Sequence, residues 1–217
     1  MKYKITVVLL GALFVAGFLP GRAEERATSR YPDIEIGPKF NDKGELLLPV
    51  DFRKWIFIGS PLTPNDLNDG AAGFPEFHNV YIEPAAYEYY VKNGKWPEGT
   101  MMVKELQLTK NGTFEDGSRL EASGRGYFPG TVNGMDVSVK DSKLFADTNG
   151  WGFFNFGHQP PPYSATAAEA PVESCAGCHM ASAHEDMVFS DFYKQHLEPL
   201  QRNTASESDY VTSMSKD

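Results

Sequence analysis

Two cysteines and a histidine stand close together near the C-terminal end of the 217-residue chain. They form the segment Cys175-Ala176-Gly177-Cys178-His179, which has the C-x-x-C-H pattern of c-type haem attachment. The chemistry needs this spacing, because the two thiols add to the two haem vinyl groups and the adjacent imidazole then falls under the iron. The segment therefore predicts a covalent haem c bound through Cys175 and Cys178, with His179 as the iron ligand.

Other uses of the two cysteines fit the sequence less well. A disulfide between residues three positions apart would close a small ring and stabilise the fold little. A thioredoxin-like redox pair usually lies near the start of a βαβ unit, and no such pattern precedes Cys175. A zinc site would need a second ligand pair at a similar spacing, which the sequence lacks. About 150 residues of the expected mature chain precede the motif, unlike in small helical cytochromes, and this favours a β-rich haem protein.

A second residue with chemical potential is Lys104. The segment 100–106 alternates in strand fashion and places Met102, Lys104 and Leu106 on one face. A lysine between apolar residues is unusual if that face is buried, and it would then need a special role. On an edge or surface face Lys104 would simply be solvated. The residues alone leave both interpretations open.

The other histidines and several aromatic residues are weaker candidates. His158 could serve as a sixth iron ligand, but the segment 157–162 is typical of a surface loop. His184 and His196 fall in an expected C-terminal helix and are interpreted as structural. Phenylalanines are numerous enough to line a haem pocket, although aromatic residues in strands more often belong to a plain core. They are Phe74, Phe77, Phe153, Phe154 and Phe156.

Short strands and helices separated by Gly, Pro and Asn must position these residues. The expected strands are 79–82, 101–108, 126–128, 135–139 and 151–156. The expected helices are 83–92, 141–146 and 185–197. The first of these helices has Pro84 in its first turn and Gly94 just past its end. We therefore expect one α+β domain over residues 40–200, an antiparallel β-sheet with helices packed at one side.

The N-terminus indicates export. Lys2 and Lys4 precede an apolar run of about 15 residues that ends in small residues, which predicts a signal peptide over 1–23 with cleavage after about Ala23. A membrane anchor is the alternative, but a spanning helix needs about 20 apolar residues. Residues 24–39 then form a flexible lead-in, and the polar segment 201–217 is expected to be a disordered tail.

The charge balance excludes one class of partner. Cleavage after residue 23 removes three basic side chains and no acid, so the net charge changes from −9 to −12, with 17 basic against 29 acidic side chains. Such a chain does not bind nucleic acid, and no basic patch or phosphate-binding glycine loop indicates otherwise. An acidic surface instead suits a positively charged redox partner.

Runs of residues along the expected domain resemble the cytochrome P-460 family. They occur in the right order relative to Cys175 and cover nearly the whole domain. They are Phe40–Pro49, Thr63–Gly70, Val80–Pro84, Gly99–Thr100, Val103–Leu106, Ser138–Lys143 and Asp186–Phe189. The resemblance implies a periplasmic homodimer with a β-sheet haem pocket.

The resemblance also implies an activity and gives Lys104 a role. The family's enzymes oxidise hydroxylamine at an open distal iron site. Two NH2OH molecules become N2O and water, and four electrons pass to an acceptor, here expected to be a soluble redox protein such as a cytochrome c. In these enzymes a lysine side-chain nitrogen is bonded to a haem meso carbon. The matching position in this chain is Lys104.

Two positions depart from the family pattern. A distal carboxylate accepts protons in the enzymes, and alignment of the segment 137–141 places it at Asp136, where the pattern has Glu. Asp is one methylene shorter, by about 1.5 Å, and a base must come within hydrogen-bond reach or act through water. His78 stands where the pattern has Arg, and it could shuttle protons near neutral pH. Alternatively, Asp136 is a solvated strand or turn residue, and His78 has only a structural role.

Three functions remain open from the sequence. The first is a hydroxylamine oxidoreductase with a Lys-cross-linked haem. The second is a gas-binding protein similar to cytochrome c′-β, which has the same fold and an apolar distal pocket and binds nitric oxide or carbon monoxide without turnover. Lys104 and Asp136 distinguish the two, because the binding proteins lack the cross-link. The third, a simple electron carrier, is disfavoured because none of the seven Met residues stands out as a sixth ligand.

Overall fold

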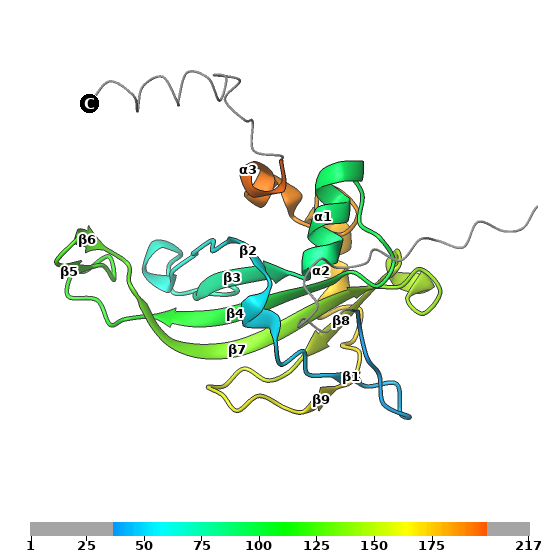
Figure 1. Cartoon of the computed structure of the whole chain (residues 1–217). Coiled ribbons are helices and arrows are strands. Elements are labelled where there is room, and N and C mark those ends of the chain that lie inside the picture. Colours follow the sequence, from blue (N-terminus) through cyan, green and yellow to red (C-terminus); the bar gives the residue numbers. More distant parts are fainter. Residues whose placement is uncertain (1–36, 199–217) are drawn as a thin grey trace, which may run out of the picture.

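A five-stranded antiparallel sheet forms the centre of the molecule (Figure 1). The computed structural model describes residues 37–198, so the expected signal peptide, the lead-in up to residue 36 and the tail 201–217 lie outside the described residues. The strand order is β2-β3-β4-β7-β8. These strands are β2 (Ile56–Gly59), β3 (Phe77–Ile82), β4 (Met101–Thr109), β7 (Pro129–Lys140) and β8 (Trp151–Asn155).

Three helices lie on one side of this sheet and a small strand pair on the other (Figure 1). The helices are α1 (Pro84–Asn93), α2 (Ala176–Ser182) and α3 (Lys194–Leu197). The strand pair is β1 (Leu46–Leu47) with β9 (Thr166–Ala167). A separate hairpin joins β5 (Arg119–Glu121) to β6 (Gly124–Gly126). The α+β class, with helices at one side of an antiparallel sheet, is as the sequence predicts.

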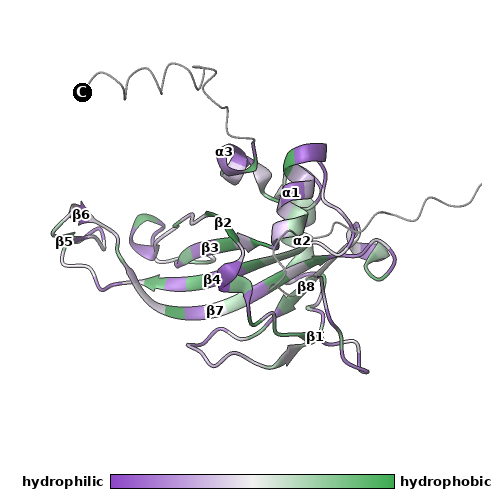
Figure 2. Cartoon of the chain, in the orientation of Figure 1, coloured by the Kyte–Doolittle hydropathy of each residue, from purple (hydrophilic) through white to green (hydrophobic). Residues whose placement is uncertain are grey.

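Each face of the sheet has its own apolar core because strand residues alternate between faces. On the helix side, Val80, Met102 and Phe153 pack with Ala86 of α1 and Ala176 of α2. The opposite core joins β-strand residues to β1 and β9. It contains Leu46, Phe52, Trp55, Met101, Val103, Met135, Val137, Val139, Phe145, Phe154, Phe156 and Ala167. Figure 2 shows hydrophobic and hydrophilic residues in alternating bands along β4 and β7.

Helix α1 begins and ends where the proline and glycine of its sequence indicate. The Glu83 side chain accepts hydrogen bonds from the backbone N–H groups of Ala85 (3.1 Å) and Ala86 (3.0 Å), which have no partner within the helix. Gly94 ends the helix at φ 67°, a left-handed conformation that glycine adopts at little cost. The expected helix over 83–92 is therefore confirmed.

The expected helix over 141–146 is wrong. The chain forms turns there, followed by a 3-10 turn over Ala146–Thr148. The Asp141 carboxylate accepts from the backbone N–H groups of Lys143 (2.9 Å) and Leu144 (3.0 Å). Such side-chain bonds offer the backbone an alternative to helix, and local pattern does not reveal which of the two wins.

The expected helix over 185–197 is only partly correct. A tight turn occupies 185–188, and Asp186 and Met187 both have positive φ values, 47° and 62°. Helical structure begins only at Ser190, first as a 3-10 turn and then as α3. The strand expected at 126–128 is wrong except at Gly126, because β6 covers Gly124–Gly126 and the next strand begins only at Pro129. Among residues 37–198, no helix is long and apolar enough to cross a membrane.

Candidate haem site

The C-x-x-C-H segment lies against the helix side of the sheet. Helix α2 begins directly after Cys175 and packs near β8. Both cysteines are free thiols; Cys175 is half-buried against the helix-side core, whereas Cys178 is exposed. The seven-residue helix brings both thiols and the following imidazole together. Both thiols are therefore available for covalent attachment.

The imidazole of His179 is oriented for metal ligation. Its Nδ1 lies 2.7 Å from the backbone oxygen of Met187, so Nδ1–H donates to that carbonyl and Nε2 keeps its lone pair. The rings of Phe153 and Phe189 flank it, with centroid distances of 4.5 Å and 5.0 Å. Burial lowers the pKa of His179 and keeps the ring neutral, as a ligand must be.

Lys104 lies on the same face of the sheet as the haem motif. In the sheet register it stands between Val80 of β3 and Asp136 of β7, and residues directly opposite each other share a face. Val80 and Met102 belong to the core that also contains Ala176. The Lys104 side chain is only 28% exposed. The edge-strand interpretation of Lys104 is therefore wrong, because β4 is the middle strand of the sheet.

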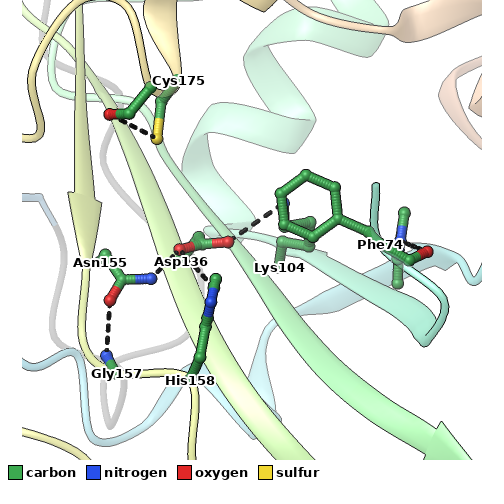
Figure 3. A network of polar contacts seen from close by, with 9 residues as sticks. Phe74, Lys104, Asp136, Asn155, Gly157, His158 and Cys175 are labelled. Carbon is green, nitrogen blue, oxygen red and sulfur yellow. Dashed lines mark hydrogen bonds and ion pairs between the residues drawn. The ribbon is translucent and has the colours of Figure 1, made fainter. Parts of the chain in front are cut away.

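Asp136 is the centre of a polar network on this face (Figure 3). One carboxylate oxygen lies 3.1 Å from Lys104 Nζ, and the other accepts a hydrogen bond from Asn155 at 2.7 Å. His158 Nε2 lies 3.8 Å away, the distance of an ion pair rather than a hydrogen bond. Burial acts to raise the pKa of Asp136, but His158, Lys104 and Asn155 outweigh it and lower the pKa to about 2. Asp136 is therefore a carboxylate at neutral pH.

Phe74 connects this network to two histidines. The Lys104 ammonium lies 4.0 Å from the centre of the Phe74 ring, a cation–π contact. His78 Nε2 lies 3.2 Å from the Phe74 backbone oxygen, and the His78 and His158 rings meet the Phe74 ring edge to face. Burial and the Lys104 charge lower the pKa of His78, whereas Asp136 raises that of His158. At neutral pH His78 is therefore an uncharged imidazole that can take up a proton.

Glu76 is a second carboxylate near these residues, and sequence reasoning missed it. It is 7% exposed, and Oε1 accepts a hydrogen bond from Asn133 at 3.0 Å, whereas Oε2 has no partner among the described residues. Its charge raises the pKa of both His78 and His158, so it lies close to them. The available signal was a carboxylate two residues before His78, the spacing of side chains on one strand face.

The two halves of the site influence each other electrostatically. Burial lowers the pKa of His179 and the Met187 hydrogen bond raises it, and these are the two largest effects. Smaller effects come from the charge of Lys104, which lowers this pKa, and from that of Asp136, which raises it. The donor set fits a c-type haem, because two free thiols and a neutral imidazole lie on the face that carries Lys104. Among residues 37–198, no group of three or more His, Cys, Asp or Glu side chains could hold a metal ion, so the iron would be held by the haem and His179.

Only some of the other residues singled out from the sequence lie near this face. Phe154 and Phe156 belong to the opposite core and cannot line the haem site, whereas Phe153 and Phe74 contact site residues. His184 precedes the C-terminal helical turns, is 70% exposed and lies 3.8 Å from Asp191. His158 lies in a loop, as expected, but this loop returns over Asp136. Loop direction is set by tertiary contacts that local sequence does not encode.

The lowered pKa of Asp136 predicts a pH-dependent contribution to stability. The folded pKa of about 2 is below the ordinary value of 3.8, so the stabilisation is present above about pH 4 and is lost as the pH falls towards 2. Asp136→Asn should lower the free energy of unfolding of the haem-free protein by about 2 kcal/mol at pH 7. Urea denaturation should show this difference shrinking near pH 2. An equal difference at both pH values would contradict it.

Comparison with known proteins agrees with this site. The family model described as Cytochrome P460 matches residues 49–190, which include the whole polar network and the C-x-x-C-H segment. A search of curated proteins found no match to the chain.

Proposed function

Because the chain belongs to the cytochrome P460 family, we propose that it is an exported haem oxidoreductase that oxidises hydroxylamine to nitrous oxide. Membership of this family implies a haem-binding cytochrome with redox chemistry. The finer proposal is a haem c held by Cys175 and Cys178, ligated by His179 and cross-linked to Lys104. One observation carries it: the Lys104–Asp136 pair, at 3.1 Å, lies on the face that α2 covers with the haem motif.

The reaction releases protons as well as electrons, and this defines the work of the protein. Two NH2OH give N2O, H2O, four protons and four electrons. The haem would supply the iron site and the route for electrons, whereas side chains must take up the protons. Asp136 can accept a proton at either carboxylate oxygen, and the neutral His78 can accept one at its ring nitrogen that does not face Phe74.

The charge of Lys104, together with His158 and Asn155, weakens Asp136 as a base. With a free ammonium 3.1 Å away, the pKa of Asp136 is about 2. A general base works best when its pKa lies near the operating pH, so Asp136 is a weak base in this state. A bond between Lys104 Nζ and a haem carbon would convert the ammonium into an uncharged amine. The pKa of Asp136 would then rise because one cause of its depression is removed. Cross-linking would thus strengthen the base as well as fix the haem.

A specific observation also favours the second candidate, a gas-binding protein similar to cytochrome c′-β. If Lys104 stays unmodified, Asp136 remains a weak base locked between Lys104 and Asn155. Such a protein would bind nitric oxide but would catalyse no reaction. The two functions therefore differ in whether the Lys104 ammonium survives maturation.

Turnover separates the two candidates. The purified, matured protein should reduce an artificial electron acceptor when hydroxylamine is added, and gas chromatography should detect N2O. Four electrons should be transferred for each N2O formed. Nitric oxide binding without hydroxylamine-dependent reduction of the acceptor would instead support the gas-binding protein.

Covalent haem attachment is a separate prediction. The protein expressed with a cytochrome c maturation system should keep its haem through acid–acetone extraction, because thioether bonds survive it. Cys175→Ala together with Cys178→Ala should lose these bonds. The experiment is best done in a Lys104→Ala background, so that a lysine bond cannot retain the haem. Haem that stays bound in the triple variant would show that the C-x-x-C-H segment is not the attachment site.

Assembly and location are further parts of the proposal. We propose a periplasmic homodimer that passes electrons to a soluble, positively charged acceptor such as a cytochrome c, because the chain carries a net charge of −9 before any cleavage. Sedimentation at micromolar concentration should give twice the mature mass. A clean monomer over that range would contradict the dimer.

A further inference from the structure

The carbonyl that orients His179 belongs to an unusual turn. Glu185 and Val188 form an isolated antiparallel bridge, and the Val188 N–H donates to the Glu185 oxygen at 2.9 Å. The two central residues, Asp186 and Met187, have φ values of 47° and 62°. Positive φ at both positions is the pattern of a type I′ turn, which favours Asn-Gly. Aspartate tolerates this conformation, but methionine does so rarely, so surrounding contacts must hold the turn.

Two cross-strand neighbours hold the Asp186 side chain. Lys140, the last residue of β7, pairs with one carboxylate oxygen, and Trp151 Nε1 donates to the other at 3.2 Å. Lys140 and Trp151 are directly opposite each other in the β7–β8 ladder, and the ammonium lies 5.5 Å from the indole ring. The Lys140 side chain is 13% exposed and Trp151 is 1% exposed. The turn is therefore tied to the rigid edge of the sheet through both oxygens of one carboxylate.

The other central residue of the turn is also fixed. The Met187 side chain is 6% exposed in the helix-side core, and its sulfur accepts a weak hydrogen bond from Asn149 at 3.7 Å. Its carbonyl accepts the Nδ1–H of His179 at 2.7 Å. A continuous chain of contacts thus joins the end of β7 to the nitrogen of His179 that does not face the iron site.

We propose that Lys140 and Asp186 form a clamp that positions the His179 ligand and sets the electronic properties of the haem iron. The inference rests on the proposed ligation by His179, but not on hydroxylamine oxidation. A strong hydrogen bond from Nδ1–H makes an imidazole a stronger donor to a metal. The clamp holds the Met187 carbonyl in place for this bond. Lys140 and Asp186 are positioning residues, because neither touches the haem ligand directly.

The test compares Lys140→Met with Lys140→Arg in the haem-loaded protein. Lys140→Met leaves Asp186 without its cationic partner, so the turn relaxes and the hydrogen bond to His179 weakens. The iron–histidine stretching frequency of the ferrous protein should fall, and the haem reduction potential should rise. Lys140→Arg keeps the charge and should restore both towards wild type. Asp186→Asn removes the same ion pair by changing its acidic partner, and asparagine still suits the turn. The stretching frequency and the reduction potential should therefore shift in the same directions as in Lys140→Met.

Lys194→Met is the matched control, because it removes another ion pair of the same region, at 3.8 Å from Glu198, on an exposed residue. It should leave the frequency and the potential unchanged. Wild-type values in haem-loaded Lys140→Met and Asp186→Asn would overturn the clamp, even if both variants unfold more easily. Failure of the wild-type protein to show any iron–histidine band would instead count against the proposed ligation. The two failures are therefore distinguishable.

Discussion

Lys104→Ala is expected to abolish hydroxylamine oxidation while the haem stays covalently attached. The thiols of Cys175 and Cys178 and the imidazole of His179 lie on α2 and its N-terminal flank, whereas Lys104 lies on β4 and contacts Asp136 and Phe74. The meso-carbon bond would be lost, so the conjugation of the ring would be that of an ordinary haem c. The visible spectrum should change from an unusual one to that of an ordinary cytochrome.

The matched control for this experiment is Lys110→Ala. Lys110 follows the end of β4, is 50% exposed, and has only a distant ion pair at 3.9 Å from Glu121. The Lys110→Ala variant should retain the wild-type visible spectrum and hydroxylamine oxidation. An ordinary spectrum in correctly matured wild-type protein would contradict the enzyme proposal and favour the gas-binding alternative.

Asp136→Ala is expected to slow hydroxylamine oxidation at least a hundredfold without preventing hydroxylamine binding. General-base assistance contributes about 10²–10⁴-fold, or roughly 3–5 kcal/mol of the barrier. Asp136 is the carboxylate beside Lys104, so its removal takes away the acceptor nearest to the expected cross-link. Stopped-flow single turnover with an artificial oxidant separates binding from the chemical step. Asp136→Glu should keep or raise the rate, because the longer side chain restores the reach of the family's Glu.

Asp116→Ala provides the control for a general loss of a charged carboxylate. The pKa of Asp116 is also lowered to about 2, through its hydrogen bonds to Ser118 and Arg125, but its partner Arg125 belongs to β6 of the separate hairpin. The Asp116→Ala variant should oxidise hydroxylamine at the wild-type rate. A wild-type rate in Asp136→Ala would show that the base lies elsewhere. His78 and the buried Glu76 would then be the next residues to replace.

The sequence predicted the elements whose signals are local. Helix α1 has a proline at its start and a glycine at its end, and the segment 101–108 has a strand-like pattern, so α1 and β4 were both correctly expected. The shared face of Met102 and Lys104 followed from the same alternation. The resemblance to cytochrome P-460 is confirmed by the family match over residues 49–190.

Three features that the sequence did not reveal depend on distant residues. The segment 185–188 looks helical, but Lys140 and Trp151, far away in sequence, hold Asp186 in a turn. His158 was correctly placed in a loop, yet only the tertiary fold brings it within 3.8 Å of Asp136. Glu76 gave almost no signal, because burial of a single loop carboxylate depends on how strands β3 and β7 are arranged. Long-range packing, rather than propensity, fixes these three positions.

The most direct test of the proposed cross-link is peptide mapping of the matured wild-type protein by mass spectrometry. We expect one species in which the haem joins two peptides, one containing Cys175 and Cys178 and the other containing Lys104. Fragmentation should place the second bond on the Lys104 side-chain nitrogen, and Lys104→Ala should yield only the cysteine-linked haem peptide. A wild-type protein whose haem is attached to the cysteine peptide alone, with an unmodified Lys104 peptide recovered in full, would contradict the proposed cross-link.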